Sequence, residues 1–129
     1  MQTAGIFMTQ VRARRVLVAD DNEDAGESLA MLLRHDGHEV QVANNGTDAV
    51  ALFDRMQPDV VILDIGMPGL SGYEVAGRIR ERDAGKSAML IAVTGWGQQT
   101  DKARAARAGF DHHFTKPVEP ESLSALLAK

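Results

Sequence analysis

Five short apolar runs recur along the chain, and each is followed by a stretch with the spacing of an amphipathic helix. This alternation is typical of parallel strands joined by helices, because a parallel strand needs a long crossover before the next one. The pattern predicts strands near residues 15–19, 39–43, 59–63, 89–93 and 111–115, and helices near 23–36, 46–56, 72–83, 98–108 and 119–128. The expected fold class is therefore α/β, with a single doubly wound five-stranded parallel sheet between two layers of helices.

The helical stretches also indicate how each helix begins and packs. Asn22 is a suitable N-cap for the helix near 23–36, Gly37 lies just past its end, and one face carries Ala25, Leu29, Leu32 and Leu33. The helix near 98–108 is instead rich in Ala and Arg and has only a weak apolar stripe. A helix that buries little apolar area is loosely held, so we expect it to be a moving part.

Length and composition exclude several classes of protein. The 129 residues suit one domain, which we place at residues 14–129 after a loose tail at 1–13. The absence of Cys excludes disulfides and thiol nucleophiles, and the net charge of −4 argues against direct nucleic-acid binding. No run approaches the roughly 18 apolar residues of a membrane span, and the first residues do not resemble a signal peptide. We therefore expect a cytoplasmic protein that does not bind membranes.

Polar residues follow the predicted strands at the points where their apolar runs end. Asp20 and Asp21 follow the first strand, Asp64 the third, Thr94 the fourth and Lys116 the fifth. The carboxyl ends of parallel strands share one edge of the sheet, where ligands bind in open α/β folds. Three carboxylates gathered there repel one another, and a hard divalent cation with oxygen ligands, Mg²⁺, relieves that repulsion. The arrangement indicates a phosphoryl-transfer site.

Each of these residues also has an ordinary structural explanation when it is considered alone. Asp is favoured at helix starts, a strand-end Asp is often a cap, and a Lys at a strand end is usually a surface residue. Pro117, however, restricts Lys116 to an extended backbone and permits a cis peptide that would aim the ammonium inward. The occurrence of all these residues on one edge is what favours a functional site.

The sequence does not predict a metal site at the four histidines. His35 and His38 flank Gly37 in a helix-to-strand turn, where we expect both to be exposed to solvent. His112 and His113 are adjacent, so in a strand they face opposite ways and cannot both ligate one metal from that strand.

The order and spacing of these motifs resemble the receiver domain of two-component response regulators, a family related in fold to flavodoxin and to the bacterial chemotaxis regulator. The resemblance covers roughly residues 14–128. The residues that carry it are Val16-Leu17-Val18-Ala19-Asp20-Asp21-Asn22, Asp64 with Met67-Pro68-Gly69, Ser71-Gly72, Thr94-Gly95, Ala108-Gly109-Phe110 and Lys116-Pro117.

The resemblance implies a phosphoacceptor function for Asp64. Its phosphodonor would be a sensor histidine kinase, a phosphotransfer protein or a small phosphodonor. Asp21, Asp64 and the carbonyl of Gly66 would ligate Mg²⁺ directly, and Asp20 would act through a water. Beyond its own phosphorylation and dephosphorylation, such a domain is not an enzyme.

The resemblance also assigns residues to the phosphoryl group and to the conformational switch. Lys116 would pair with one phosphoryl oxygen, and Thr94 would donate a hydrogen bond to another. The switch aromatic of the family lies three residues before the lysine, where this chain has His113, so we hypothesise weaker or pH-sensitive signalling. Gly66 and Trp96 occupy the positions at which other receivers tune hydrolysis of the phosphoryl group. Neither side chain orients a water, which predicts slow dephosphorylation.

Three other functions remain as alternatives. A haloacid-dehalogenase-like phosphatase also uses a nucleophilic Asp with Mg²⁺, but its acid/base Asp lies two residues later, where this chain has Gly66. A flavodoxin-like cofactor binder needs a phosphate-binding loop after the first strand, where acidic residues stand here. A receiver that only binds partners would not need the complete set of phosphorylation residues.

The context of the domain stays open in the sequence. No output domain follows the last predicted helix, so the chain is a free-standing receiver or the terminal receiver of a hybrid histidine kinase. By resemblance, the face made by the segments 98–108, 111–115 and 119–128 is the surface that changes on phosphorylation. It would bind a downstream protein or a second copy of the chain.

Overall fold

The computed structural model describes residues 13–95 and 102–129, which form one five-stranded parallel sheet with the strand order β2-β1-β3-β4-β5. The strands are β1 (Arg15–Ala19), β2 (Glu39–Ala43), β3 (Val60–Asp64), β4 (Met89–Thr94) and β5 (His112–Thr115). The helices are α1 (Glu23–His35), α2 (Gly46–Met56), α3 (Gly72–Arg80), the short 3-10 helix η2 (Asp83–Gly85), α4 (Lys102–Ala108) and α5 (Pro120–Leu127). The predicted fold class is confirmed.

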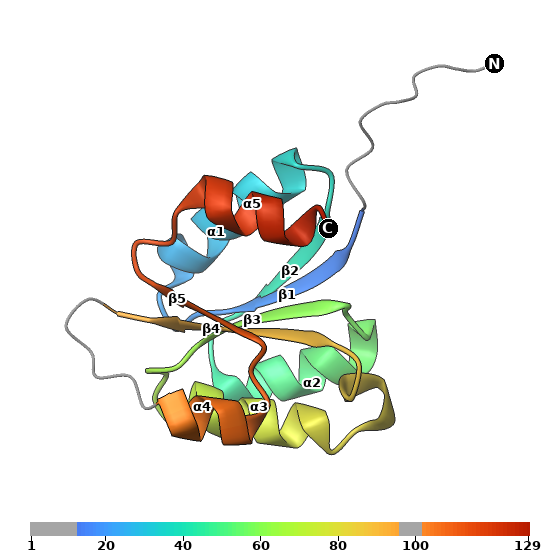
Figure 1. The fold of residues 1–129 in the computed structure, drawn as a ribbon, viewed down its shortest axis with the longest axis vertical. Helices are drawn as coiled ribbons and strands as arrows, with labels where there is room; N and C mark the ends of the chain where they lie inside the picture. The colour runs from blue at the N-terminus through green and yellow to red at the C-terminus, as the bar shows by residue number, and fades with distance from the viewer. Residues whose placement is uncertain (1–12, 96–101) are drawn as a thin grey trace.

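The helices form two layers around the sheet (Figure 1). α1 and α5 cover one face, and α2, α3 and α4 cover the other. Side chains alternate between the two faces along each strand, so Val16 and Val18 pack beneath α1 and α5, whereas Leu17 and Ala19 pack against α2 and α3. The central strands are buried on both sides and therefore read as continuous apolar runs. The edge strand β5 is largely exposed.

Local signals set the ends of the helices. The Asn22 side chain accepts a hydrogen bond from Ala25 N at 3.0 Å, and Gly37 follows α1 with a φ of 101°, which favours glycine. The Ser71 side chain accepts from Glu74 N while the Glu74 side chain accepts from Ser71 N, so a capping box starts α3. These contacts fix where α1 and α3 begin and where α1 ends.

The packing of α1 differs from the expected apolar face. Its buried residues are Gly26, Ala30 and Leu33, while Leu29 and Leu32 are only half-buried. A Cβ at Gly26 would lie 3.1 Å from Val42 Cγ1, so α1 approaches β2 closely at a residue without a side chain. Because of this close approach, the face of α1 that carries Leu29 and Leu32 is directed toward the gap between α1 and α5. The larger leucines therefore border that gap.

The prediction for His38 was wrong. His35 is exposed as expected, but His38 is only 5% exposed. Its Nδ1 accepts a hydrogen bond from Arg14 N at 3.1 Å, and burial, with a smaller effect of the Arg14 charge, lowers its pKa despite the opposing effect of Asp36. The C-terminus of α5 is held nearby, because Arg14 Nε donates to Leu127 O at 2.7 Å. The sequence around the turn gives no sign that a distant part of the chain covers it.

Some predictions fall on residues outside the described ranges. These are the tail, apart from Ala13, the loop residue Trp96, and the first part of the helix predicted at 98–108. The described part of that helix is α4, in which Ala105 is buried and Ala103 and Ala106 are exposed. Among the described helices, none combines the length and the apolar character needed to cross a bilayer.

Candidate phosphoryl-transfer site

Four strands deliver polar residues to the same edge of the sheet. Asp20 follows β1 and its backbone N–H donates to Ala43 O at 3.0 Å, which fixes it beside the end of β2. Asp64 is the last residue of β3 and lies in register with Val93, one residue before Thr94. Lys116 follows β5, and its N–H donates to Thr94 O at 2.7 Å. The parallel register thus places residues far apart in the sequence side by side.

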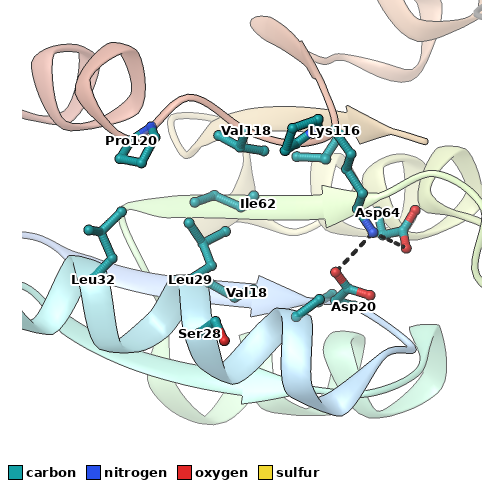
Figure 2. Close-up of a pocket in the computed structure, with 14 residues that line it drawn as sticks. Val18, Asp20, Ser28, Leu29, Leu32, Ile62, Asp64, Lys116, Val118 and Pro120 are labelled. Carbon is teal, nitrogen blue, oxygen red and sulfur yellow. Dashed lines mark hydrogen bonds and ion pairs between the residues drawn. The ribbon is translucent and has the colours of Figure 1, made fainter. Parts of the chain in front are cut away.

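Lys116 connects two of the predicted carboxylates. Its Nζ donates to Asp20 Oδ2 at 3.1 Å and to Asp64 Oδ2 at 3.2 Å, as the dashed lines in Figure 2 show. Partial burial, the largest single influence, lowers the pKa of Lys116. The hydrogen bonds and charges of Asp20 and Asp64 together outweigh it and raise that pKa above its usual value. Lys116 is therefore a fixed positive charge between two acidic side chains.

Backbone amides hold the remaining oxygens of these carboxylates. Asp20 Oδ1 accepts from Asn22 N at 2.9 Å, and Asp64 Oδ1 accepts from Gly66 N at 3.0 Å. The sequence reasoning missed Asn44, whose side-chain amide donates to Asp20 O at 3.1 Å. Its position directly after β2, at the same edge, was the available signal. The two amide contacts restrict the rotamers of side chains that are only 10% and 9% exposed.

A close backbone approach positions the loop after β3. A Cβ at Gly72 would lie 2.7 Å from Asp64 O and 2.8 Å from Ile65 Cα, so a side chain there would displace the loop. Gly72 N also donates to Ile65 O at 3.1 Å. The first residue of α3 is therefore packed directly against the backbone of Asp64, while Gly66 lies exposed at the loop surface.

Thr94 lies at the same edge but is engaged elsewhere. Its side chain is only 1% exposed, and its Oγ1 lies 3.1 Å from His113 Nε2 on the neighbouring strand β5. A hydroxyl and an imidazole nitrogen at this distance share one hydrogen bond, whose direction depends on the tautomer of the ring. Thr94 is therefore in contact with His113, the residue at the position of the family's switch aromatic.

The acidic residues have the geometry and chemistry of a divalent-cation site. Asp20, Asp21 and Asp64 each offer an oxygen, and the three oxygens lie within 4.8 Å of one another. Two of the carboxylates are buried and Asp21 is exposed, so a cation could approach from solvent. An all-oxygen donor set suits a hard cation such as Mg²⁺ or Ca²⁺. The described residues therefore fit a metal ion of this class.

The comparison with protein families decides the identity of the fold and site. The family model described as response regulator receiver domain matches residues 16–128. The chain belongs to this family. This receiver domain is similar to the protein PilH of Pseudomonas aeruginosa, at 44% identity over 110 residues, which cover 84% of this chain and 90% of that protein.

Solved structures of receiver domains share the same architecture. Chemotaxis protein CheY4 of Vibrio cholerae aligns with a TM-score of 0.83 and 26% identity, covering 90% of this chain and 97% of that one. The receiver domain of sensor histidine kinase PA1611 from Pseudomonas aeruginosa aligns with a TM-score of 0.80 and 27% identity, covering 90% and 95%. That structure has a magnesium ion coordinated in its active-site cleft.

Proposed function

We propose that this receiver domain accepts a phosphoryl group on Asp64 from a phosphohistidine of a sensor histidine kinase or a phosphotransfer protein. The observation that carries the proposal is the contact of Lys116 Nζ with both Asp20 and Asp64 at the carboxyl edge of the sheet. A carboxylate oxygen of Asp64 attacks phosphorus while the P–N bond to the donor imidazole breaks. The products are an acyl phosphate on Asp64 and a histidine that takes up a proton.

The other polar residues of the edge hold the transferred group. Lys116 pairs with one phosphoryl oxygen, and Thr94 donates its hydroxyl to another after leaving His113. Gly95, which follows Thr94, leaves space beside the hydroxyl. Phosphoryl transfer needs position and charge compensation more than covalent help from the protein, and these side chains supply both.

The acidic cluster is proposed to hold Mg²⁺ through Asp21, Asp64 and the carbonyl of Gly66, with Asp20 acting through a water. The support is the proximity of the three carboxylates and the magnesium ion in the related receiver of PA1611. When bound, the cation offsets the negative charge of the carboxylates and of the phosphoryl oxygens. Catalysis by the domain is confined to its own phosphorylation and dephosphorylation.

Loss of the phosphoryl group is proposed to be slow. Hydrolysis needs a water that attacks phosphorus, and a carboxylate or amide two residues after Asp64 would orient it. Gly66 has no side chain for that task, and Trp96, at the second tuning position, lies outside the described residues. A rapid loss that Trp96→Ala leaves unchanged would contradict this proposal.

The output surface is proposed to comprise α4, β5 and α5. β5 is an exposed edge strand beside the short helix α4, and Thr94 touches His113 on it. A change at Thr94 therefore reaches this surface through one hydrogen bond. A downstream protein or a second copy of the chain is proposed to bind there.

Intact mass spectrometry tests the acceptor. The protein is incubated with Mg²⁺ and acetyl phosphate, and wild type is compared with Asp64→Asn and with the control Asp83→Asn, which changes an exposed carboxylate in η2. One added phosphoryl group is expected in wild type and Asp83→Asn only, and hydroxylamine should release it as it does other acyl phosphates. Adduct formation on Asp64→Asn overturns the assignment, and so does a wild type that neither acetyl phosphate nor a phosphorylated histidine phosphotransfer domain labels.

A further inference from the structure

A cavity of about 590 Å³ lies between α1 and the segment Pro117–Pro120, which leads from β5 into α5. We name it the α1 trough. Figure 2 shows Leu29 and Leu32 on the α1 side, Val118 and Pro120 on the opposite side, and Ile62 of β3 between them. Its volume falls within the range of about 300–1,000 Å³ that is usual for small-molecule sites.

The trough exists because α1 and α5 are anchored by other residues. α1 packs through Gly26, Ala30 and Leu33, and α5 through its three buried leucines. Neither set fills the space beside Leu29 and Leu32. Ser124 Oγ of α5 donates to Asp36 Oδ2, on the residue that follows α1, at 2.6 Å. This hydrogen bond joins α5 to the end of α1, and neither residue lines the trough.

The two ends of the trough differ in chemistry. Most of its lining is apolar, whereas Asp20, Asp64 and Lys116 line the end at the phosphoryl site, with Asp21 adjacent. The lining has two carboxylates and one ammonium, and with the adjacent, exposed Asp21 two net negative charges remain near this end when no cation is bound. An apolar channel that leads to an excess of carboxylate suits a ligand that is itself apolar with a positive end.

We propose that the α1 trough binds an amphipathic organic cation, whose ammonium or amidinium head pairs with Asp20 and Asp64 while its apolar body lies along Leu29, Leu32 and Val118. An anionic head would meet the excess carboxylate charge, and a neutral head would leave it unpaired. The head displaces Lys116 Nζ from Asp20 and Asp64 and takes the Asp64 carboxylate that would also hold Mg²⁺, so the head and Mg²⁺ compete. Because the head would cover Asp64, the ligand would also block phosphorylation, a consequence that rests on the proposed function.

A homologous series of n-alkylamines from butylamine to octylamine tests the proposal on the unphosphorylated protein. Dissociation constants are measured by NMR titration, without Mg²⁺ and with saturating Mg²⁺. Each added methylene should tighten binding by up to about fourfold, the factor for complete transfer of a methylene from water. Saturating Mg²⁺ should weaken binding, and the alcohol of equal length should bind at least about tenfold more weakly because its neutral head forms no ion pair with the carboxylates.

Two variants of α1 separate binding in the trough from binding to the carboxylates alone. Ser28 lines the trough at the exposed surface, so Ser28→Phe should fill it and remove the chain-length dependence. Met31 is 63% exposed and is not among the lining residues, so Met31→Phe should bind as wild type does. Neither residue belongs to the phosphorylation site.

Several results would overturn the proposal. One is an affinity that does not depend on chain length, and another is a Ser28→Phe variant that binds octylamine as wild type does. A trough that binds no amine also overturns it and leaves a surface for a partner protein. All these measurements use unphosphorylated protein, so their outcome does not depend on whether Asp64 can be labelled.

Discussion

Lys116 and a divalent cation would share carboxylate neighbours. The ammonium contacts Asp20 and Asp64, which are two of the three carboxylates that fit a divalent ion. In the metal-free protein Lys116 therefore reduces the repulsion within the acidic cluster. When a cation enters, the ammonium becomes a nearby like charge.

Replacing Lys116 should therefore tighten Mg²⁺ binding. We expect Lys116→Met to raise the Mg²⁺ affinity by about tenfold, because removing a nearby like charge relieves a repulsion on the order of 1 kcal/mol or more. Isothermal titration calorimetry at low salt measures the change. Lys86→Met is the control, since Lys86 pairs with the exposed Asp83 and should leave the affinity unchanged. Weaker Mg²⁺ binding by Lys116→Met would show that the ammonium does not compete with the cation.

His113 is the residue at which this receiver departs from the usual aromatic. Its Nε2 lies 3.1 Å from Thr94 Oγ1, and in the proposed function the hydroxyl leaves this contact to reach a phosphoryl group. We expect His113→Phe to raise the steady-state phosphorylated fraction, with an equilibrium gain of about fivefold, because a neutral hydrogen bond contributes about 1 kcal/mol. Phosphate-affinity gels measure the fraction. His113→Gln keeps a polar partner and should stay near wild type, and an equal fraction in all three proteins would contradict the assigned competition.

At the scale of elements, the attachment of α4 depends on one aromatic residue of α3. The guanidinium carbon of Arg104 lies 4.2 Å from the centroid of the Tyr73 ring, and Phe110 meets the same ring edge-on, with centroids 6.4 Å apart. The alanines of α4 bury little apolar area, so these contacts carry much of its packing. Tyr73 also follows Gly72, which touches the backbone of Asp64. Tyr73 thus connects the loop after β3 with α4.

Removing the ring should loosen α4 without unfolding the domain. We expect Tyr73→Leu to increase amide hydrogen exchange of residues 105–108 by about fivefold, which corresponds to the loss of about 1 kcal/mol of ring and cation–π contacts. Exchange measured by NMR or mass spectrometry reports this change residue by residue. Tyr73→Phe keeps the ring and should exchange as wild type does. Equal protection in the Leu and Phe variants would mean that other contacts hold α4.

The ends of a helix were predictable where neighbouring residues in the sequence determine them. The Asn22 cap and the Gly37 turn follow from neighbouring residues, and the structure has both. The orientation of α1 was not predictable, because it depends on how closely Gly26 approaches Val42 on another element. Leu29 and Leu32 fit the periodicity of a core face but border an open trough instead.

At the scale of the molecule, the sequence pattern was sufficient to place the site. Five strand–helix units with polar residues at the strand ends predict one edge of a parallel sheet, and that edge has Asp20, Asp64, Thr94 and Lys116. The opposite edge was not predictable in the same way. There Arg14, His38 and the end of α5 meet across a sequence separation of more than a hundred residues, as the bond from Arg14 Nε to Leu127 O shows.

At that opposite edge, His38 predicts a pH-dependent stability of the folded molecule. Burial lowers the pKa of His38, with Arg14 acting in the same direction and Asp36 against it. His38 therefore stays neutral in the folded protein at pH values where the unfolded chain, with an ordinary histidine pKa near 6.5, already takes up a proton. Protons bound preferentially by the unfolded state favour unfolding, so the free energy of unfolding should fall as pH drops below about 6.5 toward the lowered folded-state pKa.

Urea unfolding at pH 7.5, 6.5 and 5.5 measures this contribution. His38→Gln keeps a side-chain acceptor for Arg14 N but does not titrate, so its stability should fall less steeply between pH 6.5 and 5.5, by at most about 1.4 kcal/mol per pH unit. His35→Gln changes the exposed histidine at the end of α1 and should keep the wild-type slope. Equal slopes in wild type and His38→Gln would show that the unfolded and folded states bind the His38 proton equally. The burial of one turn by the C-terminus of the chain would then have no effect on how the molecule responds to acid.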